Sequence, residues 1–269
     1  MSYQPRDILY RRATDADDAA LQSMLQQNPM DGWVRLCLQR APSYFPGTQL
    51  MGRSIPVIGL DQATNGRPVG MYDATFLPVW ANAKPVQAGY LGGLRVTPDY
   101  RHRLSLLKGG FASVQRLLKE EMAAAALCFT SIASDNHAAR RLLEAGLKGM
   151  PRYSPLGELE TLAIAARQAK RAGVLRQATA KDIPAIADLH GRQAAAYQFS
   201  PYLSEAWLQG LNGANGLRLE DFWLLEGNTR LQGCFALWDQ RAIKQTVISG
   251  YRFQLEYLRG MHNLFATLS

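Results

Sequence analysis

Three basic side chains stand where a long helix is expected to begin. The helix is predicted by apolar residues that recur at spacings of four, three and four: Leu107, Phe111, Val114 and Leu118. Arg101, His102 and Arg103 lie at its start. The first N–H groups of a helix have no partner inside it, and the positive end of the helix dipole lies there, so phosphate groups bind readily. We therefore expect a phosphorylated ligand at this point.

The elements around this helix read as a mixed sheet with helices. A helix is expected over 15–38, interrupted near Asn28-Pro29, and strands are expected at 55–60, 69–80 and 88–96. After the long helix come a buried strand at 127–133, a short helix and a last strand at 158–164. Asp135 can cap the short helix, whose inward side is formed by Ala139, Leu142 and Leu143 and which Gly146 closes.

Two segments of this order resemble the signature of the GNAT (GCN5-related N-acetyltransferase) family. Leu94-Arg95-Val96-Thr97-Pro98-Asp99-Tyr100-Arg101 is similar to the end of the family's fourth strand where it enters the pyrophosphate loop. Asn136-His-Ala-Ala139-Arg-Arg-Leu142-Leu-Glu-Ala-Gly146-Leu147 is similar to the helix and turn after the fifth strand. One long helix and one strand separate them, as in the family, and the resemblance covers residues 6–164.

The resemblance implies a fold, an activity and a set of contacts. The fold is α/β (α+β), a mixed, mostly antiparallel central sheet flanked by helices. The activity is transfer of an acetyl group from acetyl-CoA to an amine. The pantetheine arm would contact the strand where it splays from its neighbour, at Leu94, Arg95 and Val96, and also Asn136. The pyrophosphate loop would comprise Arg101, His102, Arg103, Leu104, Ser105 and Leu106.

The mechanism implied by the resemblance is direct transfer. A deprotonated amine attacks the thioester carbonyl, backbone N–H groups stabilise the oxyanion, and an acid protonates the coenzyme A thiolate. Tyr153, just beyond the second signature, is our preferred acid, with Tyr100 and Tyr90 left open, and a structural role is the alternative for each of the three. The base is not identified, and Asp73 is only a guess. The acceptor is a small-molecule or protein amine.

Three leucines depart from the family pattern. Leu104 and Leu106 occupy loop positions where the family has small residues, and the glycines come later, as Gly109-Gly110. Leu143 replaces a tyrosine that often protonates the thiolate. These departures leave open a second interpretation, a catalytically silent GNAT-fold module that binds a ligand or a partner.

The basic charge of the chain is concentrated in one segment. Residues 95–152 contain ten Lys or Arg and five Asp or Glu. The difference, five positive charges, is most of the net charge of +8. Such a segment attracts any polyanion, and a phosphorylated cofactor fits it as well as nucleic acid does. A solvated basic surface is the plain alternative. Nucleic acid is the less favoured partner because the aromatic residues are not interleaved with the basic ones.

A weak internal repeat divides the chain. Ala13, Thr14 and Asp17 match Ala178, Thr179 and Asp182 at an offset of 165, and each copy reads as a strand, a capping Thr and a helix. We therefore expect a GNAT-like domain at 1–164, a linker at 165–172 and a second GNAT-like domain at 173–269. The second domain is expected to have helices at 182–196 and 204–211 and a hairpin of strands at 221–226 and 231–238.

The second domain is expected to be incomplete. No Val-x-Pro strand end and no phosphate-binding helix follow its hairpin before Ser269. We expect it to lack a cofactor site of its own, either through truncation or because its role is structural.

The composition is typical of a cytoplasmic protein. The longest apolar stretch, 122–129, is far shorter than the roughly 20 residues of a membrane span, and the N-terminal residues do not resemble a signal peptide. Three widely separated cysteines indicate neither a disulfide framework nor a zinc site, and no metal is expected. The sequence leaves open whether the chain is a monomer or a dimer.

Overall fold

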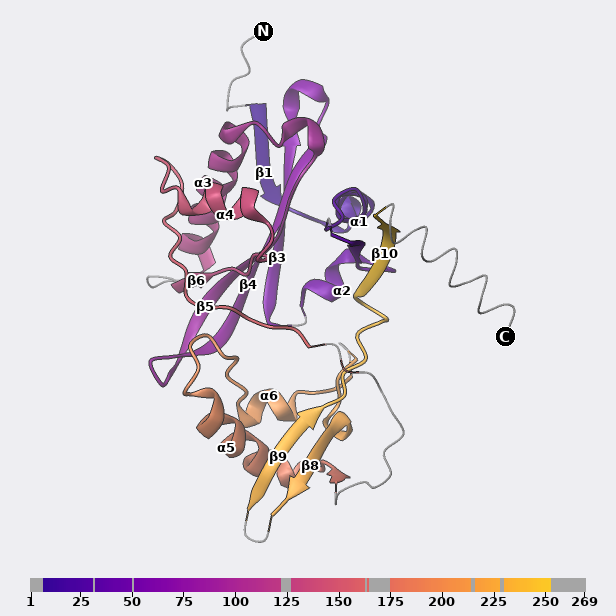
Figure 1. Cartoon of the computed structure of the whole chain (residues 1–269), viewed down its shortest axis with the longest axis vertical. Helices are drawn as coiled ribbons and strands as arrows, with labels where there is room; N and C mark the ends of the chain where they lie inside the picture. The colour runs from indigo at the N-terminus through magenta and orange to yellow at the C-terminus, as the bar shows by residue number, and fades with distance from the viewer. Residues whose placement is uncertain are drawn as a thin grey trace, which may run out of the picture. The chain divides into compact units, whose positions relative to one another are not determined.

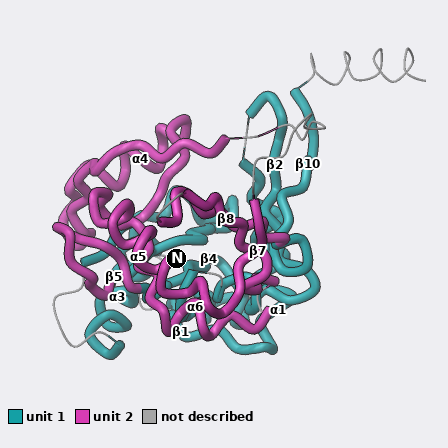
Figure 2. Tube along the Cα trace, turned by 90° about the horizontal axis from the view of Figure 1, so that it is seen from below, with its two compact units in different colours: residues 1–77, 89–129, 240–269 teal, residues 78–88, 130–239 magenta. Residues whose placement is uncertain are grey.

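The computed structural model describes residues 7–30, 32–49, 51–121, 127–162, 164, 175–213, 216–227 and 230–252. These residues form two compact units that alternate along the chain (Figure 2). Unit 1 comprises residues 1–77, 89–129 and 240–269, and unit 2 comprises 78–88 and 130–239. This grouping differs from the consecutive division expected at 1–164 and 173–269, and the expected linker at 165–172 lies outside the described residues.

A five-stranded sheet in the order β1-β3-β4-β5-β6 is the main element of unit 1 (Figure 1). Its strands are β1 (Ile8–Arg12), β3 (Arg53–Asp61), β4 (Arg67–Ala81), β5 (Lys84–Val96) and β6 (Leu127–Phe129). β1 pairs antiparallel with β3, and β3 pairs antiparallel with β4. The turn between β3 and β4 uses left-handed conformations at Asn65 and Gly66, which suit both residue types. The expected mixed, mostly antiparallel sheet is confirmed.

Alternation along β4 sends successive side chains to opposite faces of this sheet. Tyr72, Ala74 and Phe76 pack against Val114 and Leu117 of helix α3 (Leu104–Glu121). Met71 packs on the other face, in a cluster with residues of helices α1 (Asp18–Gln26) and α2 (Tyr44–Thr48). Each face is therefore covered by helix, so the core of unit 1 lies on both sides of β3 and β4.

The buried side of α3 agrees with the expected one at Val114 and Leu118 and differs from it elsewhere. Its buried residues are Leu106, Ser113, Val114 and Leu117, and the helix begins at Leu104 rather than near Arg101. The reason is a contact with β1: the Tyr10 hydroxyl donates to the Leu106 carbonyl, and an added Cβ at Gly109 would lie 2.9 Å from Tyr10 Cε2. The close approach of Tyr10 fixes which side of α3 turns inward.

Two elements expected from local patterns are wrong. The expected helix over 15–38 ends after α1, and Val34–Gln39 is strand β2, which pairs antiparallel with β10 (Gln245–Tyr251). That partner lies more than 200 residues away, so no local pattern indicates it. The strand expected at 158–164 is absent from its described residues, and Leu159, Leu162 and Ile164 are exposed.

Unit 2 contains a second, smaller core. A three-stranded antiparallel sheet in the order β7-β8-β9 packs with two helices around buried residues that include Ile186, Leu208 and Leu224. Its elements are helix α4 (His137–Glu144), β7 (Leu175–Gln177), α5 (Ile183–Ala194), α6 (Glu205–Gln209), β8 (Phe222–Glu226) and β9 (Leu231–Ala236). The helices and the antiparallel strands expected after residue 173 are confirmed.

The internal repeat corresponds to a duplicated set of contacts. In unit 1, Asp17 accepts hydrogen bonds from the Thr14 backbone N–H and hydroxyl and from both terminal nitrogens of Arg11. In unit 2, Asp182 does the same with Thr179 and Arg176, each shifted by the offset of 165 seen in the sequence. Both carboxylates thus fix the junction between a strand and the helix that follows it.

We expect Asp17→Asn and Asp182→Asn each to lower the free energy of unfolding by about 1–2 kcal/mol at neutral pH, because each removes a capping carboxylate and its ion pair with an arginine. Arg11 then loses its carboxylate partner, whereas Arg176 keeps Glu226 at 2.6 Å. Arg11 holds the pKa of Asp17 at about 2, below its ordinary value. A depressed pKa contributes stability above the unfolded value and loses it as the pH falls toward 2. Urea denaturation from pH 7 down to about pH 2 should therefore show the wild type and Asp17→Asn converging.

The matched control is Asp188→Asn, which removes an exposed pair with Arg192 on the surface of α5. It should change the unfolding free energy by less than about 0.5 kcal/mol. A loss from Asp17→Asn no larger than from this control would contradict the role assigned to the duplicated contacts.

Candidate functional site

Strand β5 leads directly into the start of α3. After Val96, the Thr97 N–H donates to the Val69 carbonyl at 3.0 Å, and a short 3-10 helix, η4 (Pro98–Tyr100), turns the chain toward Leu104. The Arg101 side chain folds back on the strand end, with Nε 3.4 Å from the Val96 carbonyl and Nη2 2.7 Å from Asn28 Oδ1. Both partners are neutral oxygens, so the positive charge of Arg101 is not neutralised by them.

The expected pyrophosphate loop lies at this junction. Arg101 and His102 are exposed, and Leu104 and Ser105 are half-buried. The Leu106 N–H already donates to the Arg103 carbonyl at 3.0 Å. The N–H groups of Leu104 and Ser105 belong to the first turn of α3, where no preceding helical carbonyl can accept them. The junction therefore presents backbone donors and a guanidinium, which is the chemistry that a pyrophosphate needs.

The leucines that depart from the family pattern have different surroundings. Leu106 is buried with Val69 and Tyr100, so its side chain belongs to the core and does not cover the helix start. Leu104 is half-buried at the first position of α3. Gly109 fits the ring of Tyr10, which accounts for this glycine by packing. The structure thus removes one of the two side chains expected to crowd a phosphate.

Two of the candidate acids lie in unit 1. The Tyr100 hydroxyl donates to Asp61, and both residues are almost fully buried. This hydrogen bond to Asp61, together with burial, raises the pKa of Tyr100. A buried hydroxyl with a fixed acceptor is a structural group, so Tyr100 is not suited to protonate a thiolate. Tyr90 is half-buried, and its ring lies 5.3 Å from the ring of Phe129.

The remaining expected site residues belong to unit 2 and are described within it. Asn136, and not Asp135, caps α4: its Oδ1 accepts from the Ala139 N–H at 3.1 Å. Leu143 is buried on the inner side of this helix. Tyr153 is half-buried in an irregular segment after the helix. The roles assigned to Asn136 and Tyr153 stay predictions.

A buried polar cluster in unit 1 is the feature that sequence reasoning largely missed. Asp73 of β4 is 4% exposed. Its carboxylate accepts from Arg40 Nη1 at 3.0 Å and from the Tyr44 hydroxyl at 2.9 and 3.0 Å. The Arg40 guanidinium also lies over the Tyr44 ring, 4.4 Å from its centroid. The sequence signal was an aspartate in a mostly apolar strand, and Arg40 and Tyr44 come from a different part of the chain.

Burial dominates the ionisation of this cluster. Desolvation raises the pKa of Asp73, and the charge of Arg40 opposes the shift. Desolvation also raises the pKa of Tyr44, with the Asp73 charge acting in the same direction. For Arg95 of β5, desolvation lowers the pKa, while Tyr44 and Asp73 oppose the change. These groups therefore interact through a medium of low polarity, where charges act on one another strongly.

Gly93 lets β5 pass over this cluster. Its φ is +64°, in the left-handed region, and an added Cβ would lie 2.7 Å from Asp73 Oδ2 and 3.5 Å from the Tyr44 hydroxyl. Only a glycine combines that backbone conformation with that approach. The irregularity in β5 stands one residue before the expected pantetheine strand, which begins at Leu94.

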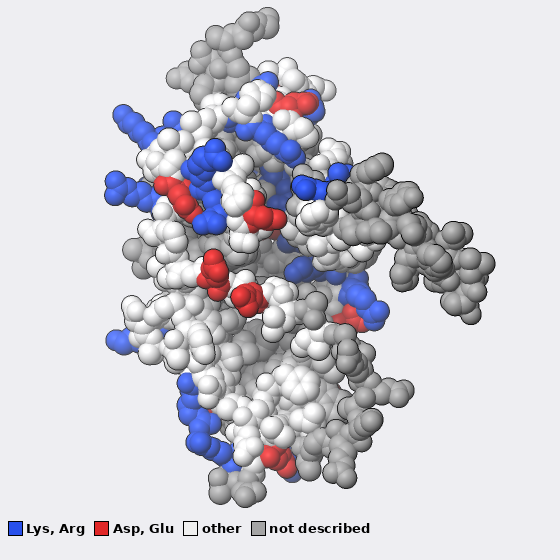
Figure 3. All heavy atoms as spheres, in the orientation of Figure 1, with Lys and Arg blue, Asp and Glu red and all other residues white. Residues whose placement is uncertain are grey.

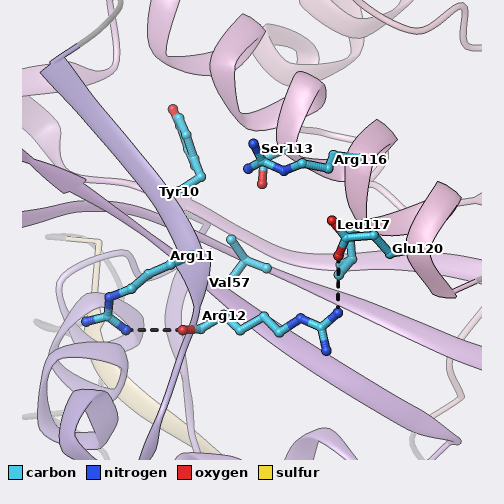
Figure 4. Close-up of a pocket in the computed structure, with 8 residues that line it drawn as sticks. All are labelled: Tyr10, Arg11, Arg12, Val57, Ser113, Arg116, Leu117 and Glu120. Carbon is cyan, nitrogen blue, oxygen red and sulfur yellow. Dashed lines mark hydrogen bonds and ion pairs between the residues drawn. The ribbon is translucent and has the colours of Figure 1, made fainter.

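A shallow hollow of about 190 Å³ lies elsewhere in unit 1, between β1 and α3 (Figure 4). Tyr10, Arg12 and Ser113 are among the side chains that line it. Arg12 is paired with Glu120 at 3.3 Å and with Glu121 at 2.6 Å, and Arg11 is paired with Asp17. Arg11 and Arg12 are therefore neutralised, while Arg116, which also lines the hollow, is exposed on α3.

The surface charges are interspersed. On the face that Figure 3 shows, Lys and Arg side chains are scattered among Asp and Glu. Asp99 is paired with Arg67 at 2.9 Å, and Glu121 bridges Arg12 and Arg53. Among the described residues, no three His, Cys, Asp or Glu side chains are grouped as a metal ion would require. None of the helices in the described ranges has the length and apolar composition of a membrane span.

We expect Gly93→Ala to lower the free energy of unfolding by at least about 3 kcal/mol, because the methyl group adds a clash with Asp73 to the cost of the left-handed backbone. Gly66→Ala is the matched control: φ is +74° there and no atom lies within 4 Å of the added Cβ. It should cost about 1 kcal/mol. Thermal and urea unfolding of both variants measure the difference, and equal losses would mean that the contact with Asp73 is not constraining.

Comparison with known proteins gives structural likeness only. The sequence matches no family model and no curated protein. The structure of Saccharomyces cerevisiae N-myristoyltransferase with bound myristoyl-CoA aligns with a TM-score of 0.50 and 12% identity, covering 89% of this chain and 64% of that one. Aminoglycoside 6'-N-acetyltransferases from Acinetobacter baumannii and Acinetobacter haemolyticus align over 57% and 60% of this chain and 99% of their own, with TM-scores of 0.38 and identities of 13% and 12%.

The fold can be stated from these observations. The sheet order, the helices on both of its faces and the passage from β5 into α3 agree with the order of elements that the sequence resemblance implies. The likeness to the yeast N-myristoyltransferase extends over most of the chain. The chain has the GNAT fold.

Proposed function

We propose that the chain is an acyl-CoA-dependent N-acyltransferase that moves an acetyl group from acetyl-CoA to an amine. The observation that carries the proposal is the junction of β5 and α3. There the first-turn N–H groups of α3 and the Arg101 guanidinium, whose hydrogen bonds go to neutral oxygens, lie beside the end of a strand. This arrangement suits a ligand with a pyrophosphate and an amide-containing arm. The fold also supports the proposal, because the structurally similar yeast N-myristoyltransferase has myristoyl-CoA bound.

The residues divide between the two parts of such a ligand. We assign the pantetheine arm to the backbone of Leu94, Arg95 and Val96 and to Asn136. We assign the pyrophosphate to the loop residues: Arg101, His102, Arg103, Leu104, Ser105 and Leu106. For Leu106 only the backbone is concerned, because its side chain is buried.

The chemistry requires a proton at the departing sulfur. Acetyl-CoA supplies a thioester carbonyl; a C–N bond forms to the amine, the C–S bond breaks, and the amine proton is released while the thiolate takes one up. We assign protonation of the thiolate to Tyr153. Tyr100 is set aside because its hydroxyl is buried and donates to Asp61.

The alternative is a catalytically silent module with the same fold. The sequence observations that favour this alternative are the departures from the family pattern at Leu104, Leu106 and Leu143. Leu106 no longer supports it, because the side chain packs in the core away from the helix start. Leu104 and Leu143 still distinguish this chain from the family pattern, so binding of the cofactor is the decisive measurement.

Calorimetric titration of the full chain with acetyl-CoA should show binding that Arg101→Glu weakens by at least about ten-fold, because the reversal places a negative charge beside the phosphates. Arg116→Glu makes the same charge change on an exposed part of α3, further along the helix. It should change the dissociation constant by less than about three-fold. No binding by a folded sample would refute the transferase and favour the silent module.

Tyr153→Phe should lower kcat by about a hundred-fold and leave the affinity for acetyl-CoA unchanged, because the phenol is proposed to act on the leaving thiolate only. Thiol release in the presence of an amine panel measures kcat. Tyr197→Phe, at a tyrosine that is 70% exposed in the same unit, should match the wild type. An unchanged kcat in Tyr153→Phe would move the acid role to another group.

A further inference from the structure

The buried cluster around Asp73 contains more positive than negative charge. Asp73 is almost fully buried and has Arg40 as a direct ion-pair partner at 3.0 Å. Arg95 of β5 is the second guanidinium that interacts with Asp73, Tyr44 and Arg40. Arg40 is ion-paired with this carboxylate, and Arg95 acts on it through its charge, with no direct ion pair between them among the described residues. A desolvated cation without a full counter-charge is costly, so this surplus calls for a physical reason.

Arg95 also has an unmet hydrogen-bond donor. Arg95 Nη1 donates a hydrogen bond to the carbonyl of the preceding residue, Leu94, at 2.8 Å. Its Nε is buried and has no hydrogen-bond partner in the structure that the described residues form. Buried polar groups in proteins are nearly always paired, and an exception indicates a water, an ion or a ligand. The surplus charge and the unmet donor occur on the same side chain.

The residue is nevertheless reachable. Arg95 is half-buried, and Leu94 beside it is 43% exposed. The Arg40 side chain is 19% exposed. The hydrogen bond from Arg95 Nη1 to the Leu94 carbonyl is exposed, so a small ligand can approach that side of the guanidinium without unfolding β5.

We propose that Arg95 binds a carboxylate of the amine acceptor, so that the substrates are amines that carry an acid group, such as amino acids or peptides with a free carboxyl end. The assignment rests on the proposed transferase function. A guanidinium is suited to bind a carboxylate through two parallel N–H bonds, and such a bond would satisfy Nε and balance the surplus charge.

The position of Arg95 favours the acceptor over the cofactor as the source of this anion. Arg95 lies on the strand assigned to the pantetheine arm, which is a neutral amide. The phosphates are assigned to the residues that follow Val96, at the start of α3. The cofactor therefore brings no negative charge to Arg95, and the second substrate is the remaining source.

Matched ligands test this directly by calorimetry on the full chain, with and without CoA. The probes are N-acetylglycine against N-acetylglycinamide and N-acetylphenylalanine against its amide. At least one acid should bind about ten-fold or more tightly than its amide, as expected for a charge-assisted bond. Arg95→Gln should abolish the preference and leave binding of the amide unchanged. Arg116→Gln, which removes an exposed guanidinium on α3, should retain it.

Two further measurements distinguish ligand binding by Arg95 from a structural role. Arg95→Lys keeps the charge without the planar fork and should give an intermediate preference. Arg95→Gln should not lower Tm, because it removes a surplus buried cation, whereas an Asp73→Asn variant should lower it. A fall in Tm for Arg95→Gln as large as for Asp73→Asn would show that Arg95 is a structural counter-ion and would overturn the proposal.

The outcomes separate this proposal from the transferase itself. Equal or absent binding of the acids, or a preference that survives Arg95→Gln, overturns the acceptor assignment. Weaker binding of CoA by Arg95→Gln with no change in acid preference would place a cofactor phosphate at Arg95 and also overturn it. Thiol release from acetyl-CoA with glycine and with glycinamide is measured separately. Its complete absence would contradict the transferase function, while the calorimetry still decides whether Arg95 binds carboxylates.

Discussion

A buried carboxylate constrains the centre of unit 1. Asp73 is enclosed within the sheet and is held by Arg40 and Tyr44, neither of which is near it in sequence. Removing one partner of such a buried pair typically costs about 3–5 kcal/mol, because the other charge is left uncompensated. The helix that carries Tyr44 and the loop that carries Arg40 must therefore keep their positions on this face. The same carboxylate requires a glycine at residue 93, which shapes β5 just before its proposed ligand-binding residues.

A second constraint acts from the opposite face of the sheet. Tyr10 of β1 hydrogen-bonds to the Leu106 carbonyl and packs against Gly109, which fixes the rotation and the start of α3. That rotation turns the Leu106 side chain into the core and leaves the first-turn N–H groups at the end of β5. The two constraints meet at the junction of β5 and α3. The geometry of the proposed cofactor site is thus a consequence of packing on both faces of the sheet.

Sequence reasoning succeeded where local patterns carry the information. The strands of the meander, the helix after Arg101, and the repeat of Thr14 and Asp17 by Thr179 and Asp182 follow from short-range alternation, capping and spacing. It failed where a distant partner decides. Val34–Gln39 is a strand because β10 pairs with it, and α3 is rotated because Tyr10 approaches it. The cluster of Arg40, Tyr44 and Asp73 could not be assembled, because its members are ordinary residues in three separate elements.

The duplicated contacts indicate which parts of the fold are independent of function. The Arg11, Thr14 and Asp17 arrangement recurs as Arg176, Thr179 and Asp182, although within the described ranges only the first copy precedes a strand that leads into a basic helix start. The repeated contact therefore secures a strand and a helix in each unit without creating a site. The features proposed to bind substrates, the start of α3 and the cluster around Asp73 and Arg95, lie in the first repeat beyond this shared beginning. The proposed binding residues thus lie beyond a strand-and-helix start that the Arg, Thr and Asp contacts stabilise independently of them.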